Sequence, residues 1–104
     1  MPPLGVEYTE RFRDEARQLA DEPLDRLDAA LRELRTVFGQ PHRHAGLGIR
    51  RLKRNYFEFR VGRDLRVVFT LEGSTAILRT VGNHDQVRAY LKQVWDQAPQ
   101  GLGL

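Results

Sequence analysis

Apolar residues follow two different spacings along the chain, which divide it into a helical part and a strand-forming part. After a short alternating stretch at residues 6–8, apolar side chains recur every three or four positions, which predicts helices at residues 10–20 and 23–38. Thr9 can cap the first helix, and Pro23 suits the first turn of the second, where its missing N–H costs nothing. Because few residues separate the helices, we expect an antiparallel hairpin with one shared apolar seam.

From residue 47 to residue 81 the spacing changes to two, which is typical of β-strands. Turn-forming residues divide this stretch into an antiparallel meander. After Gly82, the pair Asn83 and Gln86 forms a capping-box pattern that predicts the start of a last helix. The first strand is the least regular, because Ile49 and Leu52 lie out of phase. The predicted strands lie at residues 48–54, 56–61, 65–71 and 75–81.

These elements predict a single α+β domain at residues 1–96. An N-terminal strand and a helical hairpin pack on a four-stranded, mostly antiparallel meander sheet, and a C-terminal helix follows. We expect the helices to cover one face of the sheet and to leave the other face open. Residues 97–104 are rich in Gly, Pro and Gln, which predicts a flexible tail.

The hairpin around Gly62 has the best-defined register. On both sides of it the odd-numbered residues are apolar, and a shift by one residue would turn one of the two apolar sets to water. The connection is then residues 62–64, and Arg60 lies directly opposite Arg66. Like charges in this position destabilise a sheet. Either the two arginines extend into water with Glu58 diagonally nearby, or both bind one anion, and paired guanidinium groups suit a phosphate.

The composition indicates a soluble, folded domain without thiol chemistry. Of 104 residues, 40% are hydrophobic and 30% are charged, and the absence of cysteine excludes disulfides, thiolate zinc sites and cysteine nucleophiles. No basic stretch followed by an apolar run begins the chain, and no segment approaches a membrane span, so we expect a cytoplasmic location and no membrane partner. His42 and His44 have no accompanying ligands nearby in sequence, and we expect neither a metal nor a small-molecule cofactor.

The charge is distributed unevenly along the chain. Residues 40–66 contain eight Lys or Arg and two acids, whereas residues 1–39 contain six Arg and nine acids. Tyr56, Phe57 and Phe59 lie among the cations of the basic segment. This pattern suits a nucleic-acid backbone, and a solvated basic strand explains it equally well.

Two residues of the last helix are further candidates for function. His84 begins the helix directly after a strand, where helix N–H groups favour anions, so it is either a first-turn surface residue or a proton donor. Tyr90 lies on the apolar stripe, and we expect core packing with its hydroxyl at the rim. The sequence lacks paired catalytic carboxylates, glycine-rich phosphate loops and a serine nucleophile motif.

The order of elements, the run YFEFRVGRDLRVVF at residues 56–69 and the ending VGNHDQVRAYLK at residues 81–92 resemble the RelE/ParE toxin superfamily. The resemblance covers residues 6–95 and is strongest in the second half. It implies one of two activities. RelE-type members cut mRNA on the ribosome without a metal, by attack of the ribose 2′-hydroxyl on the adjacent phosphorus. ParE-type members poison DNA gyrase and are not nucleases, and the fold alone does not separate the two.

The resemblance also implies roles for individual residues. Arg66 takes the place of the family's sheet arginine, and His84 that of a basic residue after the last strand. Tyr90 matches a helix tyrosine, but many relatives carry tyrosine where this chain has Arg88, so the tyrosine role is either lost or shifted to Tyr90. The residues that stand near the family's sheet lysines are Lys53 and Arg54.

The opposed arginines and the histidine favour RNA cleavage over gyrase inhibition or a noncatalytic binding role. We therefore expect a type II toxin that acts as a ribosome-dependent, metal-independent mRNA endoribonuclease and inhibits translation. Its partners are mRNA on the ribosome and a cognate antitoxin, whose acidic segment covers the basic sheet face and the helical hairpin. The base that activates the 2′-hydroxyl is Lys53 or, as its competitor, Glu58. The candidate catalytic residues are Arg66, His84, Arg60, Lys53 and Tyr90, and the candidate RNA-binding residues are Arg50, Arg51, Arg54, Arg63 and Arg88.

Overall fold

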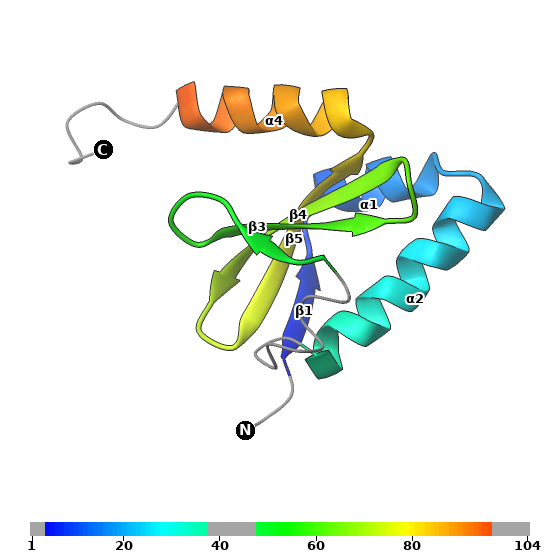
Figure 1. The fold of residues 1–104 in the computed structure, drawn as a ribbon, viewed down its shortest axis with the longest axis horizontal. Helices are drawn as coiled ribbons and strands as arrows, with labels where there is room; N and C mark the ends of the chain where they lie inside the picture. The colour runs from blue at the N-terminus through cyan, green and yellow to red at the C-terminus, as the bar shows by residue number, and fades with distance from the viewer. Residues whose placement is uncertain (1–3, 38–47, 97–104) are drawn as a thin grey trace.

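A computed structural model describes residues 4–37 and 48–96 of the chain, so the predicted tail lies outside the described residues. Five strands form one sheet in the order β1-β5-β4-β3-β2, and within it β1 pairs with β5 in parallel while the other pairs are antiparallel. Helices pack against this sheet (Figure 1). The described elements are β1 (Gly5–Tyr8), α1 (Glu10–Arg17), α2 (Asp21–Val37), β2 (Arg50–Arg51), β3 (Tyr56–Val61), β4 (Leu65–Glu72), β5 (Thr75–Gly82) and α4 (His84–Asp96).

The two N-terminal helices are confirmed, with ends that differ slightly from the prediction. Thr9 caps α1, because its hydroxyl oxygen accepts a backbone N–H of the first turn at 3.1 Å. α1 ends at Arg17 rather than at residue 20, since the next N–H bonds to the carbonyl three residues back. α2 begins at Asp21, which puts Pro23 in the first turn, where a backbone N–H has no partner within the helix in any case.

The predicted register of β3 and β4 is confirmed. Arg60 pairs with Arg66 and Val61 with Leu65, so that residues 62–64 connect the strands. Gly62 has a φ of 65°, a left-handed conformation that glycine adopts without steric cost. The odd-numbered side chains of both strands share one apolar core with α1 and α2: Phe57, Phe59, Val61, Leu65, Val67 and Phe69.

β2 is shorter than predicted, because a tight turn replaces its second half. The strand consists of Arg50–Arg51, and in the turn that follows Arg54 has a φ of 54°. Ile49 and Leu52 pack into cores on opposite faces of the sheet. Their odd spacing, which looks out of phase in the sequence, therefore reflects a segment that contributes to both faces.

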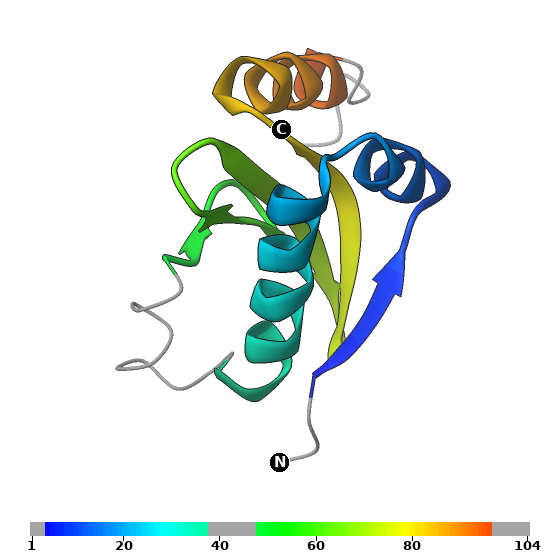
Figure 2. The same ribbon diagram turned by 90° about the vertical axis from the view of Figure 1, so that its right-hand side faces the viewer.

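Helices lie on both faces of the sheet, so the prediction that one face is open is wrong. Val67 and Val68 are consecutive residues of β4 that point to opposite faces, and both are 0% exposed. Val67 belongs to the core under α1 and α2, whereas Val68 packs against Val87 and Leu91 of α4. In Figure 2, α4 and α2 lie apart, whereas Arg11 of α1 reaches the ring of Tyr90 on α4. Across the described residues, no helix combines the length and the apolar character that a membrane crossing needs.

Candidate active site

One row across three strands brings the predicted arginines together. Arg60 of β3 pairs with Arg66 of β4, and Arg66 pairs in turn with Gly82 of β5. Neighbouring strands lie about 4.8 Å apart, so the row extends over about 10 Å. His84 follows Gly82 by two residues and begins α4. Two guanidinium groups and an imidazole therefore originate from adjacent positions at one end of the sheet.

A buried carboxylate holds one of the two arginines. Glu58 is 4% exposed, its Oε1 accepts a hydrogen bond of 2.9 Å from Nη1 of Arg66, and Nε of Arg50 lies 3.5 Å from the same oxygen. Arg60 is exposed and has no carboxylate partner among the described residues. Because a guanidinium has several N–H donors, Arg66 keeps donors for an anion while Glu58 fixes its orientation. One of the two alternatives from the sequence was that Glu58 relieves the repulsion between the arginines. In the structure Glu58 binds Arg66 and does not bind Arg60.

The position of His84 is set by the predicted capping box, which is confirmed. The N–H of Asn83 donates to Oε1 of Gln86 at 2.8 Å, and the N–H of Gln86 donates to Oδ1 of Asn83 at 2.8 Å. A Cβ at Gly82 would lie 2.7 Å from Oε1 of Gln86, so any other residue here would displace the Gln86 side chain from its capping bond. The His84 side chain is exposed, on a backbone that these bonds fix.

Tyr90 packs in the core beneath α4. It is 8% exposed, it packs with Val68 and Leu91, and the guanidinium carbon of Arg11 lies 4.7 Å from its ring centroid. Burial raises the pKa of Tyr90 above its ordinary value of 10.0, and nearby Tyr56 acts in the same direction. The phenol is therefore protonated at neutral pH and can donate a hydrogen bond there.

Glu15 is a structural residue whose role the sequence does not reveal. Its Oε1 accepts hydrogen bonds of 2.7 Å from Oγ1 of Thr80 and 3.1 Å from the N–H of Val81. β1 pairs with β5 only as far as Leu78, so the carboxylate supplies an acceptor where no strand does. Its Oε2 lies 3.3 Å from Nε of Arg11. The helical spacing of Arg11 and Glu15 predicts their ion pair, but nothing in that spacing points to β5.

Lys53 lies at the opposite end of α4 from His84. Its Nζ is 4.6 Å from the ring centroid of Trp95. At a helical rise of about 1.5 Å per residue, His84 and Trp95 are separated by about 16 Å along α4. The structure therefore does not bring Lys53 and His84, the predicted base and acid, to one phosphate.

The candidate RNA-binding arginines are exposed at three separate places. Arg50 and Arg51 form β2, and Arg54 lies in the turn after it, where its carbonyl accepts a bond of 2.6 Å from Nε of Arg51. Arg63 lies in the β3–β4 turn, and Arg88 is on α4. Among these arginines, only Arg50 forms an ion pair with a carboxylate, Glu58, within the described part of the chain.

The possible metal ligands His42 and His44 lie outside the described residues. Within residues 4–37 and 48–96, histidine and carboxylate side chains form no group of three or more that could hold a metal ion.

Comparison with known proteins identifies the fold. No family model and no curated protein matches the sequence. A chain of the RelB-RelE antitoxin-toxin complex from Methanococcus jannaschii is 21% identical, with 82% of this chain and 98% of that chain covered and a TM-score of 0.66. A mutant of E. coli toxin RelE in the free state is 17% identical, with 91% of this chain and 98% of that chain covered and a TM-score of 0.67. A mutant of E. coli YafQ is 13% identical, with 81% of this chain and 97% of that chain covered and a TM-score of 0.62. The chain therefore has the fold of the RelE toxins.

Proposed function

We propose that the chain is the toxin of a type II toxin–antitoxin pair and that it cleaves mRNA on the ribosome. The observation that supports this most directly is the row of Arg60, Arg66 and Gly82 with His84 two residues further on. Directly opposed arginines destabilise a sheet, and Glu58 relieves this for Arg66 alone, so a site that binds an anion explains Arg60 better than a structural role does. The RelE-like fold supports a toxin, and the residue types in the row suit phosphoryl transfer.

The proposed reaction uses the RNA's own nucleophile. The 2′-hydroxyl loses its proton to a base and attacks the adjacent phosphorus, and the bond to the 5′-oxygen breaks, which leaves a cyclic phosphate and a 5′-hydroxyl. Arg66 and Arg60 stabilise the negative charge on the nonbridging oxygens. His84 donates a proton to the leaving 5′-oxygen. Of the two candidate bases, Glu58 is nearer to the row, with its buried carboxylate bound to Arg66, and Lys53 lies at the far end of α4.

Exposed arginines around this row would bind the flanking phosphates. Each phosphate neutralised on a single strand contributes about 0.7 to the slope of log affinity against log salt. The binding we propose is therefore strongly salt-dependent and largely independent of base sequence. The residues assigned to it are Arg50, Arg51, Arg54, Arg63 and Arg88.

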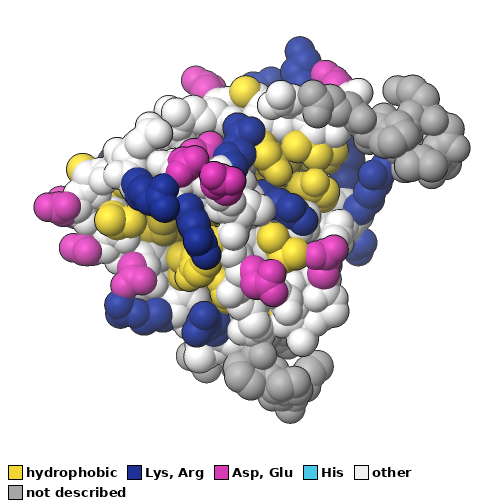
Figure 3. All heavy atoms as spheres, turned by 180° about the vertical axis from the view of Figure 1, so that it is seen from behind, with side chains coloured by type: hydrophobic (Ala, Val, Ile, Leu, Met, Phe, Trp, Pro, Cys, Tyr) yellow, Lys and Arg dark blue, Asp and Glu magenta, His cyan; other side chains and the backbone are white. Residues whose placement is uncertain are grey.

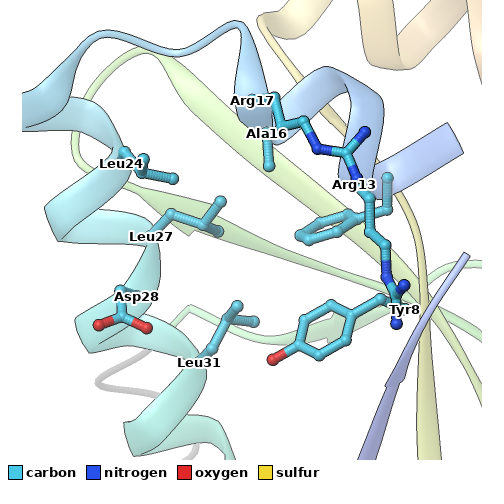
Figure 4. Close-up of a pocket in the computed structure, with 9 residues that line it drawn as sticks. Tyr8, Arg13, Ala16, Arg17, Leu24, Leu27, Asp28 and Leu31 are labelled. Carbon is cyan, nitrogen blue, oxygen red and sulfur yellow. The ribbon is translucent and has the colours of Figure 1, made fainter. Parts of the chain in front are cut away.

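A groove between α1 and α2 supports an antitoxin as the second partner. It encloses about 370 Å³, and Tyr8 and Leu24, which are 40% and 37% exposed, both line it (Figure 4). Arg13 and Arg17 lie on the α1 side. On the face shown in Figure 3, apolar side chains reach the surface between Lys and Arg side chains. We propose that an amphipathic acidic segment of the antitoxin binds here, and Leu24→Asp should weaken that complex.

An in vitro translation assay that maps mRNA 5′ ends tests the proposed function. We expect the wild-type chain to cut within codons on stalled ribosomes, and Arg66→Ala to abolish the cuts while it still binds the antitoxin. Arg35 is an exposed arginine of α2, and the control variant Arg35→Ala should cut mRNA as the wild type does. Intact mRNA would contradict cleavage, and intact mRNA combined with inhibited DNA supercoiling by gyrase would assign a ParE-type activity instead.

A further inference from the structure

A basic cavity lies along α4 from Arg88 to Asp96, beyond the turn at which His84 begins the helix. It encloses about 540 Å³ and is lined by three cations, Lys53, Arg88 and Lys92, together with Trp95 and Asp96. The Lys53 ammonium lies 4.6 Å from the centroid of the Trp95 ring. We call the set of Lys53, Arg88, Lys92 and Trp95 the α4 basic cluster.

The cations of the α4 basic cluster differ from most arginines of the helical hairpin in having no carboxylate partner. On α1 and α2, four of the six arginines pair with acids three or four residues away, as Arg11 does with Glu15. Within the described residues, none of the three cluster cations forms an ion pair. Arg88 and Lys92 are four positions apart on α4, and like charges at this spacing destabilise a helix. An anionic ligand would remove this repulsion.

The indole N–H of Trp95 lacks a hydrogen-bond acceptor among the described residues. The Nε1 atom of this side chain is buried. A buried indole N–H normally has an acceptor, so the Trp95 side chain lacks one stabilising hydrogen bond among the described residues. The cavity brings three cationic groups and an aromatic ring together.

We propose that the α4 basic cluster is a binding site for the phosphates of single-stranded RNA, distinct from the row that we propose to cleave it. Cationic side chains together with an aromatic ring are typical of surfaces that bind single strands without base preference. Along α4 the site extends from about 6 Å (Arg88) to about 16 Å (Trp95) beyond His84, so it would bind nucleotides that flank the cleaved one. Lys53 is then a binding residue and not the base. The inference rests on the proposed function only in taking RNA as the ligand.

Trp95 is the one tryptophan of the chain, so its fluorescence reports on this site alone. The full chain is titrated with a 2′-O-methyl oligouridylate, which has no free 2′-hydroxyl and cannot be cleaved by the proposed reaction. We expect binding to quench Trp95, with a salt-dependent Kd. Lys53→Gln and Lys92→Gln should each lower the slope of log affinity against log salt by about 0.7, the contribution of one phosphate on a single strand. Arg35→Gln on α2 is the matched control and should leave the slope unchanged.

The outcomes separate this site from its alternatives. If fluorescence anisotropy of a dye-labelled oligonucleotide shows binding while Trp95 emission stays constant, RNA binds elsewhere and the inference is overturned. If polyglutamate quenches Trp95 and the oligonucleotide does not, the ligand is an acidic protein and not RNA. Quenching by the oligonucleotide without mRNA cleavage on ribosomes would remove the proposed activity and leave this site in place.

Discussion

Arg60 and Arg66 face each other across β3 and β4, and the buried carboxylate of Glu58 binds only Arg66. Arg60 thus adds repulsion to the sheet and forms no ion pair within the described residues. We expect Arg60→Ala to leave the free energy of unfolding unchanged or to raise it by up to about 1 kcal/mol, the scale of like-charge repulsion in a sheet. Urea denaturation followed by circular dichroism measures this difference.

The neighbouring Phe59 provides the contrast for that measurement. It is 0% exposed, and Phe59→Ala should lower the free energy of unfolding by about 3 to 5 kcal/mol because it opens a cavity in the core. A loss of similar size in Arg60→Ala would show that Arg60 is a structural residue, and the proposed anion site would then lose one of its two arginines.

The bond between Glu58 and Arg66 predicts energetic coupling between the two side chains. In a double-mutant cycle with Glu58→Gln and Arg66→Gln, we expect an interaction energy of about 0.5 to 3 kcal/mol, since each single change removes the charged bond between the two side chains. Glu72→Gln, at an exposed position of β4, is the control and should show no coupling to Arg66. Strictly additive effects of Glu58→Gln and Arg66→Gln would mean that the carboxylate does not hold the arginine in solution.

The parts of the fold that the sequence predicts are those set by local spacing. The alternation around Gly62 fixes a register because a slip exposes a whole apolar set, and the pairing of Arg60 with Arg66 follows from it. The second core was missed because it depends on where α4 crosses the sheet. Val67 and Val68 are adjacent and both apolar, which indicates that both faces of the sheet are covered. The pair does not identify the element that covers the second face.

Glu15 joins α1 to β5 beyond the end of β1, and its removal should be costly. Glu15→Ala leaves the Thr80 hydroxyl and the Val81 N–H without their acceptor, so we expect a loss of about 1 to 3 kcal/mol in the free energy of unfolding. Glu15→Gln keeps one acceptor oxygen and should lose less. Asp14→Ala, an exposed neighbour on α1, is the matched control, and chemical denaturation compares the three. Equal losses in Glu15→Ala and Asp14→Ala would rule out a special role for the Glu15 contacts.

The raised pKa of Tyr90 predicts that stability falls at alkaline pH. In the unfolded chain the phenol titrates near its ordinary value of 10.0, whereas burial raises the pKa of Tyr90 in the folded protein. The unfolded state therefore loses this proton first, and the stabilising contribution, complete below pH 10.0, declines as the pH rises through the folded-state pKa. Denaturation of wild type and Tyr90→Phe at pH 8 and pH 11 measures it. The phenylalanine variant should lose less stability between the two values, and identical losses would contradict the effect.

The candidate site shows the same division between local and long-range information. Sequence spacing places Arg60, Arg66 and His84 at one end of the sheet, because the register and the capping box are local features. The contacts of Glu15 with β5 and of Lys53 with Trp95 join segments that are far apart in the chain, and no periodicity encodes them. Lys53 accordingly looked like a neighbour of the row in sequence and lies at the other end of α4 in space.

His84 provides the most direct test of the proposed chemistry, because it is exposed and its removal should spare the fold. If His84 donates the proton to the leaving 5′-oxygen, His84→Ala should slow single-turnover cleavage at saturating ribosomes by a factor of about 10² to 10⁴, the usual contribution of general acid catalysis. Its affinity for ribosome-bound mRNA should change little, because the phosphate contacts that we propose are made by arginines. Asp85→Ala alters the adjacent exposed position of α4 and should cleave at the wild-type rate. Wild-type cleavage by His84→Ala would instead assign the reaction to Arg66, Arg60 and Glu58 without an imidazole, since these are the remaining groups of the row.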